Sequence, residues 1–361
     1  MKILQITYNL RPGGAERFVV DLCNQFSLDD NNEVYLLAVN NDTNPKDKHY
    51  LSSLSKNVHY ICAKSSKGLS FESIYRTYKI IKELKPDVVH AHCSILLLLL
   101  SALLNNGIKY VHTLHTLAQK NTSSSKLKFL EKILYSKFIQ AVTISNICNN
   151  SFKNYYGMNK AVCIPNGREA LVTTEKLTTI KEEIQKYKNN ENTPVFIHVA
   201  TFSKPKNQQL LFDTFMKLEE EGKDFLLVVL GELYEKCTHP YKEKGKQVVF
   251  MGRRENVGDY MACSDFFVMS SIWEGLPLSL LEAMSMGVTP ICTPAGGISD
   301  VIKDNVNGFL SDSFEQTDFY KTIIRAFDNS NKISKEDIKK CYIENYTMTG
   351  CAKKYLGVYK E

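Results

Sequence analysis

Two glutamates, Glu274 and Glu282, flank a Gly-Leu-Pro turn and the start of an apolar segment in the stretch Ser271–Ile291, SIWEGLPLSLLEAMSMGVTPI. Two carboxylates eight residues apart mean little alone, so their context decides the interpretation. A short apolar run precedes the stretch and is expected to be a buried strand. Pro277 fits the first turn of a following helix, and Gly287 would end that helix. The pattern therefore predicts a helix N-terminus between the two glutamates.

This helix N-terminus suits a diphosphate group. Free backbone N–H groups around Leu276–Ser279 and the helix dipole both favour an anion there. Carboxylates next to a phosphate make poor phosphate ligands, but they accept hydrogen bonds from hydroxyl groups well. We therefore expect Glu274 to hold the hydroxyls of a sugar on one side of the diphosphate and Glu282 those of a ribose on the other. The turn and first helical residues complete this site, namely Gly275, Leu276, Pro277 and Leu278.

A second candidate phosphate loop is NLRPGGAERF, which follows the first expected strand and opens a helix near Ala15. Because Gly13 and Gly14 lack side chains, they let backbone N–H groups approach a phosphate closely. The segment has neither the G-x-G-x-x-G spacing of a dinucleotide site nor the Lys-Ser/Thr of a nucleoside-triphosphate loop. A simple tight turn remains the alternative.

Three histidines lie at or just after the ends of expected strands. His115 follows the strand Lys109–Leu114, and His90 and His92 lie at the end of another in DVVHAHC. A lone histidine after a strand is more often structural than catalytic. For His90 and His92, lining an acceptor site and packing at a strand end are equally open.

The elements that position these residues alternate between short apolar strands and longer helical patterns, which is typical of parallel sheets covered by helices. Ligands of such sheets bind at the carboxyl ends of the strands. The fold class is therefore α/β, with two doubly wound sheets. The expected strands are Lys2–Tyr8, Val34–Val39, Val88–His90, Lys109–Leu114, Ala141–Ile144 and Ala161–Ile164 in the first sheet, and Val195–Val199, Phe225–Leu230, Val248–Met251, Phe266–Met269 and Thr289–Cys292 in the second.

Length and composition agree with two domains of a globular enzyme. The chain has 361 residues, more than one core usually organises. We place the first domain at residues 1–172 and the second at 193–345, joined by the charged segment Thr173–Asn192. Ten scattered cysteines without a Cys-x-x-Cys pair, and an N-terminus too short and polar for a signal peptide, indicate a reducing cytoplasm. The longest apolar run, Ile95–Leu104, is about half of what a bilayer-spanning helix needs.

Basic residues concentrate in the first half of the chain. Residues 1–170 contain 21 Lys and Arg against 12 Asp and Glu, whereas the remainder is slightly acidic. This surplus predicts attraction to an anion. No nucleic-acid recognition motif is present, so we expect no nucleic acid and favour an anionic membrane surface. A plain solvated surface is the alternative.

Several motifs together resemble the retaining glycosyltransferases of family 4, whose fold of two Rossmann-like domains facing a cleft is called GT-B. The resemblance covers nearly the whole chain in order and spacing. Its parts are RPGGAE, HTLHT (His112 to Thr116), IPNG (Ile164 to Gly167), KPKNQQLL (Lys204 to Leu211), MGRRENV (Met251 to Val257) and the two glutamates of WEGLPLSLLEAM. IPNG is expected to be a structural turn.

The resemblance assigns roles to the donor-binding residues. Glu274 is similar to the family residue that binds the donor sugar, and Glu282 to the ribose ligand. Lys206 is similar to the lysine that neutralises the donor diphosphate, a role that suits a point charge. Arg253 and Val257 lie where the family recognises the nucleotide base.

One position departs from the family. Members usually carry an arginine shortly before the lysine, where this chain has Thr201. Lys204 or Arg253 would then supply the missing charge, or the donor binds less tightly. On the acceptor side, His115 matches the family histidine near the anomeric centre. Gly14 would bring backbone close to the leaving phosphate.

The resemblance also implies that the C-terminal segment 346–361 forms a helix that crosses back onto the first domain. Met348, Cys351, Tyr355 and Val358 recur there at helical spacing.

The implied reaction transfers a sugar from a nucleotide sugar, such as a UDP- or GDP-sugar, to a saccharide or lipid-linked acceptor with retention of configuration. No Asp-x-Asp triplet occurs in the chain, so the transferase is expected to need no metal, and no cofactor is expected. No paired carboxylates suggest a covalent nucleophile. The expected setting is cell-surface polysaccharide synthesis, in the cytoplasm or peripherally at the inner face of the membrane. Nucleotide, sugar and acceptor stay open.

Three other functions stay open as alternatives. A sugar-nucleotide epimerase of the same fold would need its own acid and base. A nicotinamide dehydrogenase would need the missing dinucleotide fingerprint. A non-catalytic sugar-nucleotide-binding protein would bind the donor without turnover.

Overall fold

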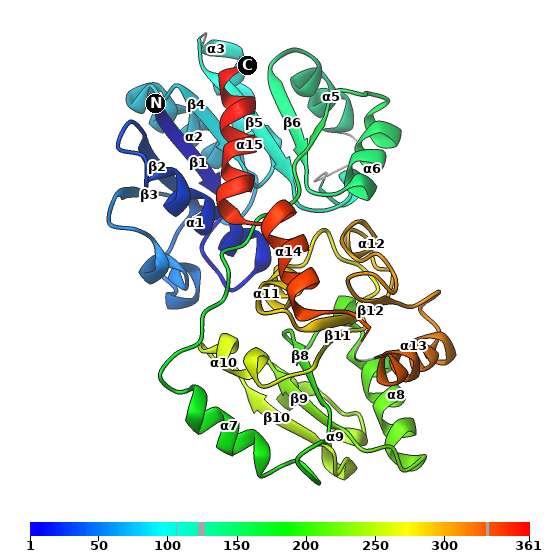
Figure 1. Ribbon diagram of the computed structural model, residues 1–361. Helices are drawn as coiled ribbons and strands as arrows, with labels where there is room; N and C mark the ends of the chain where they lie inside the picture. The colour runs from blue at the N-terminus through cyan, green and yellow to red at the C-terminus, as the bar shows by residue number, and fades with distance from the viewer. Residues whose placement is uncertain (106, 122–126, 330–331) are drawn as a thin grey trace. The chain divides into compact units, whose positions relative to one another are not determined.

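The chain forms two compact units, each built on a parallel sheet with helices around it (Figure 1). The computed structural model describes residues 1–105, 107–121, 127–329 and 332–361. Unit 1 comprises Met1–Arg168 and Met348–Glu361, and unit 2 comprises Glu169–Thr347.

Unit 1 contains a seven-stranded parallel sheet in the order β3-β2-β1-β4-β5-β6-β7. Its strands are β1 (Lys2–Thr7), β2 (Glu33–Asn40), β3 (Val58–Ser65), β4 (Val88–Ala91), β5 (Lys109–Leu114), β6 (Ile139–Thr143) and β7 (Val162–Cys163). Its helices are α1 (Gly14–Phe26), α2 (Phe71–Leu84), α3 (Leu99–Leu104), α4 (Ala118–Asn121), α5 (Lys128–Lys137), α6 (Asn146–Tyr156) and α15 (Met348–Lys360), with 3-10 turns at η1 (Pro45–Lys48), η2 (Leu51–Ser53) and η3 (Ile95–Leu98).

Unit 2 contains a six-stranded parallel sheet in the order β10-β9-β8-β11-β12-β13. Its strands are β8 (Val195–Val199), β9 (Leu226–Leu230), β10 (Val248–Gly252), β11 (Phe266–Met269), β12 (Thr289–Cys292) and β13 (Phe309–Leu310). Its helices are α7 (Leu177–Gln185), α8 (Gln208–Glu220), α9 (Tyr241–Lys244), α10 (Val257–Ala262), α11 (Leu278–Met286), α12 (Ile298–Val301), α13 (Gln316–Asp328) and α14 (Lys335–Asn345), with 3-10 turns at η5 (Lys204–Lys206) and η6 (Tyr234–Lys236).

The central strands are almost entirely buried because helices cover both faces of each sheet. Strands β4, β9 and β11 have no exposed residue, and β9 reads LLVVL. In both sheets the strand order reverses once, between β1 and β4 in unit 1 and between β8 and β11 in unit 2. Ligands of open α/β sheets bind beyond the carboxyl ends of the strands at such a reversal. The loops after these four strands are therefore the places to look for a site.

The structure adds two strands that the sequence analysis missed. Strand β3 lies at the edge of its sheet and is buried at only three of its eight residues, so it lacks a continuous apolar run. Strand β13 has two residues, too few to leave a periodic signal.

The segment Thr173–Asn192, expected to join the two domains, is instead part of unit 2. The backbone N–H and the hydroxyl of Thr174 both donate to the Asp259 carboxylate at 2.6 Å, and α7 packs on α10. The segment looked like a linker because α7 exposes its charged residues and buries only Ile180 and Ile184.

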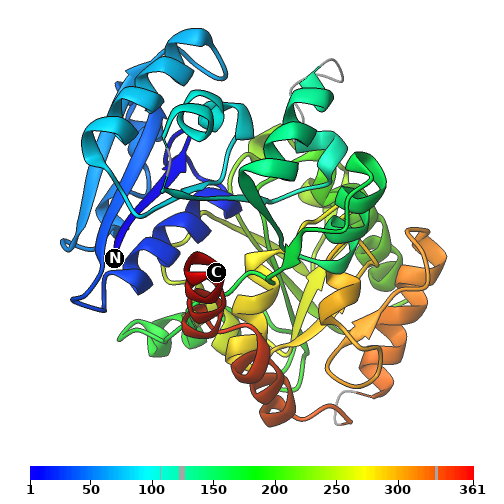
Figure 2. The ribbon, with the colours of Figure 1, turned by 90° about the horizontal axis from the view of Figure 1, so that it is seen from above.

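Helix α15 belongs to unit 1, where it packs beside α1 (Figures 1 and 2, red beside blue). It begins at Met348, two residues later than expected, and its backbone N–H donates to the Arg168 carbonyl at 3.1 Å. The inward-facing residues Cys351, Tyr355 and Tyr359 are each 5% exposed or less. The chain therefore leaves unit 1 and re-enters it at neighbouring points.

Candidate active site

The loops that follow β8 and β11 are tied together in unit 2. The backbone N–H of Ile272 donates to the Pro205 carbonyl at 2.9 Å. The hydroxyl of Ser270 lies 3.1 Å from the Lys206 carbonyl and 3.0 Å from the Asn207 carbonyl. These bonds hold the two exit loops of the strand reversal in one fixed arrangement.

Lys206 and Glu274, whose roles the sequence analysis treated separately, form an ion pair. The Lys206 Nζ lies 2.6 Å from Glu274 Oε1, and the Ser271 hydroxyl donates to the same oxygen at 2.8 Å. The Glu274 side chain is 11% exposed and that of Lys206 25% exposed. A partly buried carboxylate with two donors on one oxygen keeps its second oxygen available as a hydrogen-bond acceptor.

Helix α11 begins at Leu278, one residue after the proline that the sequence analysis placed in its first turn. Pro277 is its N-cap residue, with φ −73° and ψ 126°, and no side chain caps the N-terminus. Gly287 ends the helix in the left-handed conformation at φ 73°, which glycine adopts without strain. Because Pro277 has no side-chain oxygen to cap the first N–H groups, this nine-residue helix can receive an anion there. Glu282 is half-buried within the helix.

The remaining predicted donor-binding residues follow β8 and β10 of the same sheet. Arg253 donates to Glu232 at 2.9 Å, so a carboxylate already offsets part of its charge. Val257 is the first residue of α10 and half-buried. Thr201 is exposed after β8, and its carbonyl accepts from the Gln208 side chain at 3.1 Å. Lys204 is exposed on η5, which leaves it the better candidate for the charge that Thr201 does not supply.

One glycine near Glu274 was missed by the sequence analysis. Gly296 has φ +58°, and a Cβ built there would collide with the Glu274 backbone carbonyl. The neighbouring Gly297 N–H donates to that same carbonyl at 3.2 Å. The signal in the sequence was the glycine pair in TPAGG after β12, which resembles the pair Gly13-Gly14 after β1.

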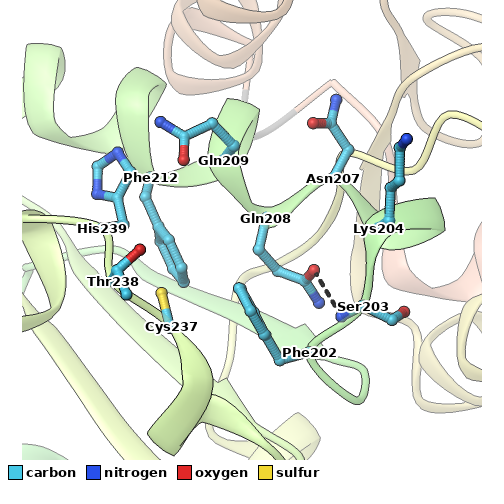
Figure 3. Close-up of a pocket in the computed structure, with 10 residues that line it drawn as sticks. All are labelled: Phe202, Ser203, Lys204, Asn207, Gln208, Gln209, Phe212, Cys237, Thr238 and His239. Carbon is cyan, nitrogen blue, oxygen red and sulfur yellow. Dashed lines mark hydrogen bonds between the residues drawn. The ribbon is translucent and has the colours of Figure 1, made fainter.

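A hollow of about 180 Å³ lies beside this region (Figure 3). It is lined by Phe202, Ser203, Lys204, Asn207, Gln208, Gln209, Phe212, Cys237, Thr238 and His239. Apart from Lys204, which the sequence offered as a substitute charge, no residue proposed for donor binding lines it. It is also smaller than the pockets of roughly 300–1,000 Å³ that usually enclose small ligands.

In unit 1, Gly13 and Gly14 lie at the start of α1. Gly13 is the N-cap residue, and a Cβ there would collide with the Glu16 carboxylate. Burial raises the pKa of this carboxyl group. Gly14 is exposed, and a Cβ there would meet no atom within 4 Å. The glycine pair is therefore not required by close packing at Gly14, whereas at Gly13 it makes room for Glu16.

His115 lies after β5, next to the strand reversal of unit 1. Its Nε2 is 2.9 Å from His92 Nδ1, and the Phe18 ring lies edge-on at 5.5 Å between centroids. Burial lowers the pKa of His115 to about 3, so the imidazole is neutral at physiological pH. His90 is fully buried between Thr113 and Tyr359, which favours the packing interpretation over lining an acceptor site.

Neither a metal cluster nor a membrane span occurs in the described part of the chain. No group of three or more His, Cys, Asp or Glu side chains there is arranged to hold a metal ion. None of the helices described is long and apolar enough to cross a membrane.

Two family models match the chain, one in each part. Residues 12–170 match the family described as Glycosyltransferase Family 4, and residues 179–341 match Glycosyl transferases group 1. Together with the paired strand reversals and the residues gathered at them, these matches show that the chain belongs to the family 4 glycosyltransferases.

Individual relatives are also glycosyltransferases. The chain is 28% identical over 290 residues to the UDP-Gal:alpha-D-GlcNAc-diphosphoundecaprenol alpha-1,3-galactosyltransferase of Escherichia coli, which covers 75% of this chain and 74% of that protein. It is 34% identical over 145 residues to the N-acetyl-alpha-D-glucosaminyl L-malate synthase of Bacillus anthracis, which covers 39% of this chain and 37% of that protein.

Solved structures show the same fold. A glycosyltransferase from Rickettsia africae matches with a TM-score of 0.82 and 20% identity over 99% of this chain and 97% of that one. Anabaena HepE in complex with UDP matches with a TM-score of 0.81 and 18% identity over the whole of both chains. The two parallel-sheet units therefore have the GT-B fold, and the protein is a glycosyltransferase.

Proposed function

We propose that this glycosyltransferase moves a sugar from a UDP-sugar to a saccharide or lipid-linked acceptor with retention of configuration. The observation that carries the proposal is the Lys206–Glu274 pair next to the uncapped N-terminus of α11. The choice of UDP as the nucleotide is supported by the E. coli galactosyltransferase, whose name includes UDP-Gal, and by the UDP complex of Anabaena HepE.

The donor-binding roles follow from the chemistry of the three groups. The first N–H groups of α11 and the Lys206 ammonium bind the diphosphate, because both offer hydrogen-bond donors and positive charge. Lys206 and Ser271 both contact Oε1 of Glu274, so its Oε2 accepts hydrogen bonds from hydroxyls of the transferred sugar. Glu282 accepts hydrogen bonds from the ribose hydroxyls. With the donor bound, Lys206 contacts an anion on each side.

Transfer with retention needs a group that takes the acceptor's proton on the face of the leaving group. The bond between the anomeric carbon and the diphosphate oxygen breaks, the acceptor oxygen bonds to the same face, and its proton passes to the departing phosphate. Lys206 and α11 stabilise the negative charge that develops on the diphosphate. Since these groups are present in the chain itself, we propose that transfer needs no metal ion.

The acceptor is proposed to be a lipid-linked saccharide that the protein meets at an anionic membrane surface. Support comes from α5, where Phe129 is 75% exposed and Lys132 and Lys137 are exposed beside it. Leu130 and Ile133 are half-buried, and Lys126 lies outside the described residues. The E. coli relative's name also contains a diphosphoundecaprenol acceptor.

Vesicle binding tests this membrane contact. Vesicles with anionic lipid should bind the protein, and added salt should release it because the attraction is electrostatic. Replacing Lys132 and Lys137 by Gln should weaken binding, whereas replacing Lys335 and Lys339 of α14 by Gln should leave it unchanged. Equal binding to neutral vesicles, or an equal effect of both double variants, contradicts the contact.

Donor class is tested by calorimetry with UDP, GDP and ADP, followed by incubation with UDP-sugars and lipid-linked or free saccharide acceptors. Tight binding of UDP, transfer in the presence of EDTA and an α-linked product from an α-linked donor are expected. Inverted product refutes retention, and loss of activity with EDTA refutes metal independence. Interconversion of UDP-sugars without acceptor indicates an epimerase, and binding without any turnover indicates a non-catalytic protein.

A further inference from the structure

A continuous chain of hydrogen bonds links His115 to the C-terminal helix of unit 1. His115 Nε2 lies 2.9 Å from His92 Nδ1, and His92 Nε2 lies 2.8 Å from the Gln5 side-chain oxygen. The Gln5 amide nitrogen donates to the Tyr359 hydroxyl at 2.9 Å. The chain thus crosses from the loops after β5 and β4 through β1 to α15, joining residues more than 240 positions apart.

The same chain continues from Tyr359 to a second buried imidazole. The Tyr359 hydroxyl lies 2.6 Å from His90 Nδ1, and His90 Nε2 lies 2.8 Å from the Thr113 hydroxyl. Thr113 in turn lies 3.0 Å from the Tyr355 hydroxyl of α15. Helix α15 therefore contributes one hydroxyl in the middle of the chain and another at its end.

Each imidazole in this chain is neutral, which fixes how its two nitrogens are used. Burial is the main cause that lowers the pKa of His90, His92 and His115, and neighbouring histidines lower it further. A neutral imidazole carries one N–H donor and one lone-pair acceptor. Once one nitrogen's role is known, the other follows.

The orientation of Gln5 sets these roles towards His115. Its oxygen accepts only, so His92 Nε2 carries the proton and His92 Nδ1 is an acceptor. His115 Nε2 must then donate, which leaves His115 Nδ1 as an unprotonated acceptor. Within the described residues, this Nδ1 has no hydrogen-bond partner.

Tyr359 is the partner of the Gln5 amide on the side away from His92. The amide nitrogen donates to the phenol oxygen, and the phenol proton then serves His90 Nδ1 at 2.6 Å. His90 Nε2 consequently donates to Thr113. All members from His115 to Thr113 are satisfied in this direction. Turning the Gln5 amide would require every imidazole to exchange its protonated nitrogen and the Tyr359 hydroxyl to donate to Gln5 instead of His90.

We propose that Tyr359 of α15 is a positioning residue that, through Gln5 and His92, fixes the proton of His115 on Nε2 and presents Nδ1 as a hydrogen-bond acceptor to a substrate hydroxyl. Its consequence for turnover rests on the proposed function. Helix α15, with which the polypeptide returns to unit 1, thereby decides which nitrogen of His115 donates and which accepts a hydrogen bond.

Unit 1 contains a second buried tyrosine–histidine pair that serves as a matched control. The Tyr135 hydroxyl lies 2.7 Å from His112 Nδ1, and His112 Nε2 donates to the Cys93 carbonyl at 2.7 Å. Both Tyr135 and Tyr359 are at most 5% exposed. Tyr135→Phe therefore deletes a comparable buried hydrogen bond without breaking the chain that leads to His115.

The first readout is the tautomer of His115 in the full-length protein, measured by NMR with ¹⁵N-labelled histidine. The His115 signals are assigned by their loss in His115→Gln. In the wild type, Nε2 should show the shift of a protonated nitrogen and Nδ1 that of an unprotonated one. Tyr359→Phe should produce a mixture of both tautomers at His115, whereas Tyr135→Phe should leave the His115 shifts unchanged.

The second readout is kinetic. Tyr359→Phe should lower kcat about tenfold with the donor KM changed less than about twofold, since a misdirected hydrogen bond affects the aligned complex more than donor binding. Tyr135→Phe should lose similar thermal stability but keep kcat. Equal kcat losses in both variants would mean a structural role and overturn the proposal.

The two readouts separate this inference from the proposed function. If His115 carries its proton on Nδ1, or if its tautomer ignores Tyr359→Phe, the inference is wrong even when transfer occurs. If the wild type shows no transfer to any acceptor, the proposed function fails while the tautomer measurement still decides the hydrogen-bond chain.

Discussion

Units 1 and 2 both place their candidate site residues in loops at the carboxyl ends of strands near the strand reversal, but they hold them with different chemistry. In unit 1, His115 is oriented by a neutral chain of imidazoles, an amide and a phenol. In unit 2, Glu274 is held by the Lys206 ammonium, the Ser271 hydroxyl and the close approach of Gly296 to its backbone.

This difference separates two kinds of sensitivity. Neutral buried groups respond to protonation, because burial disfavours the charged imidazolium. An ion pair responds to the charge of its ligand, because a bound anion competes with the carboxylate for the ammonium. Unit 1 should therefore be the acid-sensitive unit, and unit 2 the unit that senses the charge of the donor.

Acidification should give the largest effect. Burial lowers the pKa of four histidines in unit 1, His90, His92, His112 and His115, but only of His198 in unit 2. In the unfolded chain the pKa of these imidazoles is about 6.5. Between pH 6.5 and about 4 the unfolded state binds more protons, so stability present above pH 6.5 is lost as pH falls. The loss is about 1.4 kcal/mol per pH unit for each histidine that stays neutral.

Urea unfolding at pH about 7 and about 5 measures this loss. Trp273, the only tryptophan in the sequence, reports on unit 2 by its fluorescence, and histidine side-chain NMR signals report on unit 1. Unit 1 should lose more stability than unit 2. Unfolding free energies that do not change between the two pH values, or a greater loss in unit 2, would reverse the comparison.

Ligand charge should give the next largest effect, and it separates the two glutamates. Glu282→Ala should weaken UDP and UDP-sugar alike by about 1.5–3 kcal/mol, roughly ten- to a hundredfold. Glu274→Ala should leave UDP binding unchanged or tighter, because Lys206 loses its carboxylate partner. It should nevertheless lower turnover, since the anomeric carbon is no longer aligned.

Calorimetry with uridine, UDP and UDP-sugar resolves these cases. Lys206→Ala should weaken UDP but spare uridine, and Glu220→Ala on the exposed end of α8 serves as the control. Should Glu274→Ala lose UDP as severely as Glu282→Ala, the division of roles between the two carboxylates would be wrong.

The two units also differ in how much of them the sequence predicted. Helix α11 was found because Pro277 and Gly287 are strong local signals at its ends. The ion pair between Lys206 and Glu274 was not predicted, since it depends on two loops 68 residues apart meeting at a strand reversal. Local signals gave the elements, whereas the contact required the register of β8 against β11.

The hydrogen-bond chain of unit 1 was also beyond the sequence analysis. His115 stood out because it follows a strand, and α15 because its apolar residues recur at helical spacing. Tyr359 carried no signal, since its role depends on which face of α15 packs against β1 and α1. Such a network is decided by tertiary packing that no local pattern reports.

Two glycines, one in each unit, allow a comparison of the backbone near the two candidate sites, and the expected effect is smaller. A Cβ at Gly14 meets open space, whereas one at Gly296 collides with the Glu274 carbonyl. Gly14→Ala should therefore keep the stability of the protein. If the backbone there lies against the leaving phosphate, the substitution should raise the activation free energy by about 1 kcal/mol, which lowers kcat roughly fivefold. Gly296→Ala should lower both stability and turnover.

Thermal melting and steady-state kinetics of the two variants distinguish these results. Because Gly14→Ala is free of steric conflict within the protein, any loss of its activity reports on the bound ligand. Unchanged kinetics in Gly14→Ala would remove Gly14 from the candidate site.

The smallest effect tests whether unit 2 lacks a positive charge that other family members have. Thr201 is exposed after β8, and its backbone carbonyl accepts a hydrogen bond from Gln208. Thr201→Arg should add a charged donor near Lys206 and tighten UDP binding by about 0.5–1 kcal/mol, about two- to fivefold, because exposed ion pairs contribute little. The gain should shrink as salt is added, and uridine binding should not change.

Thr238→Arg provides the control, since it adds the same charge at an exposed residue lining the neighbouring hollow (Figure 3). If both variants tighten UDP equally, the gain is a general effect of net charge, and Thr201 does not mark the diphosphate site.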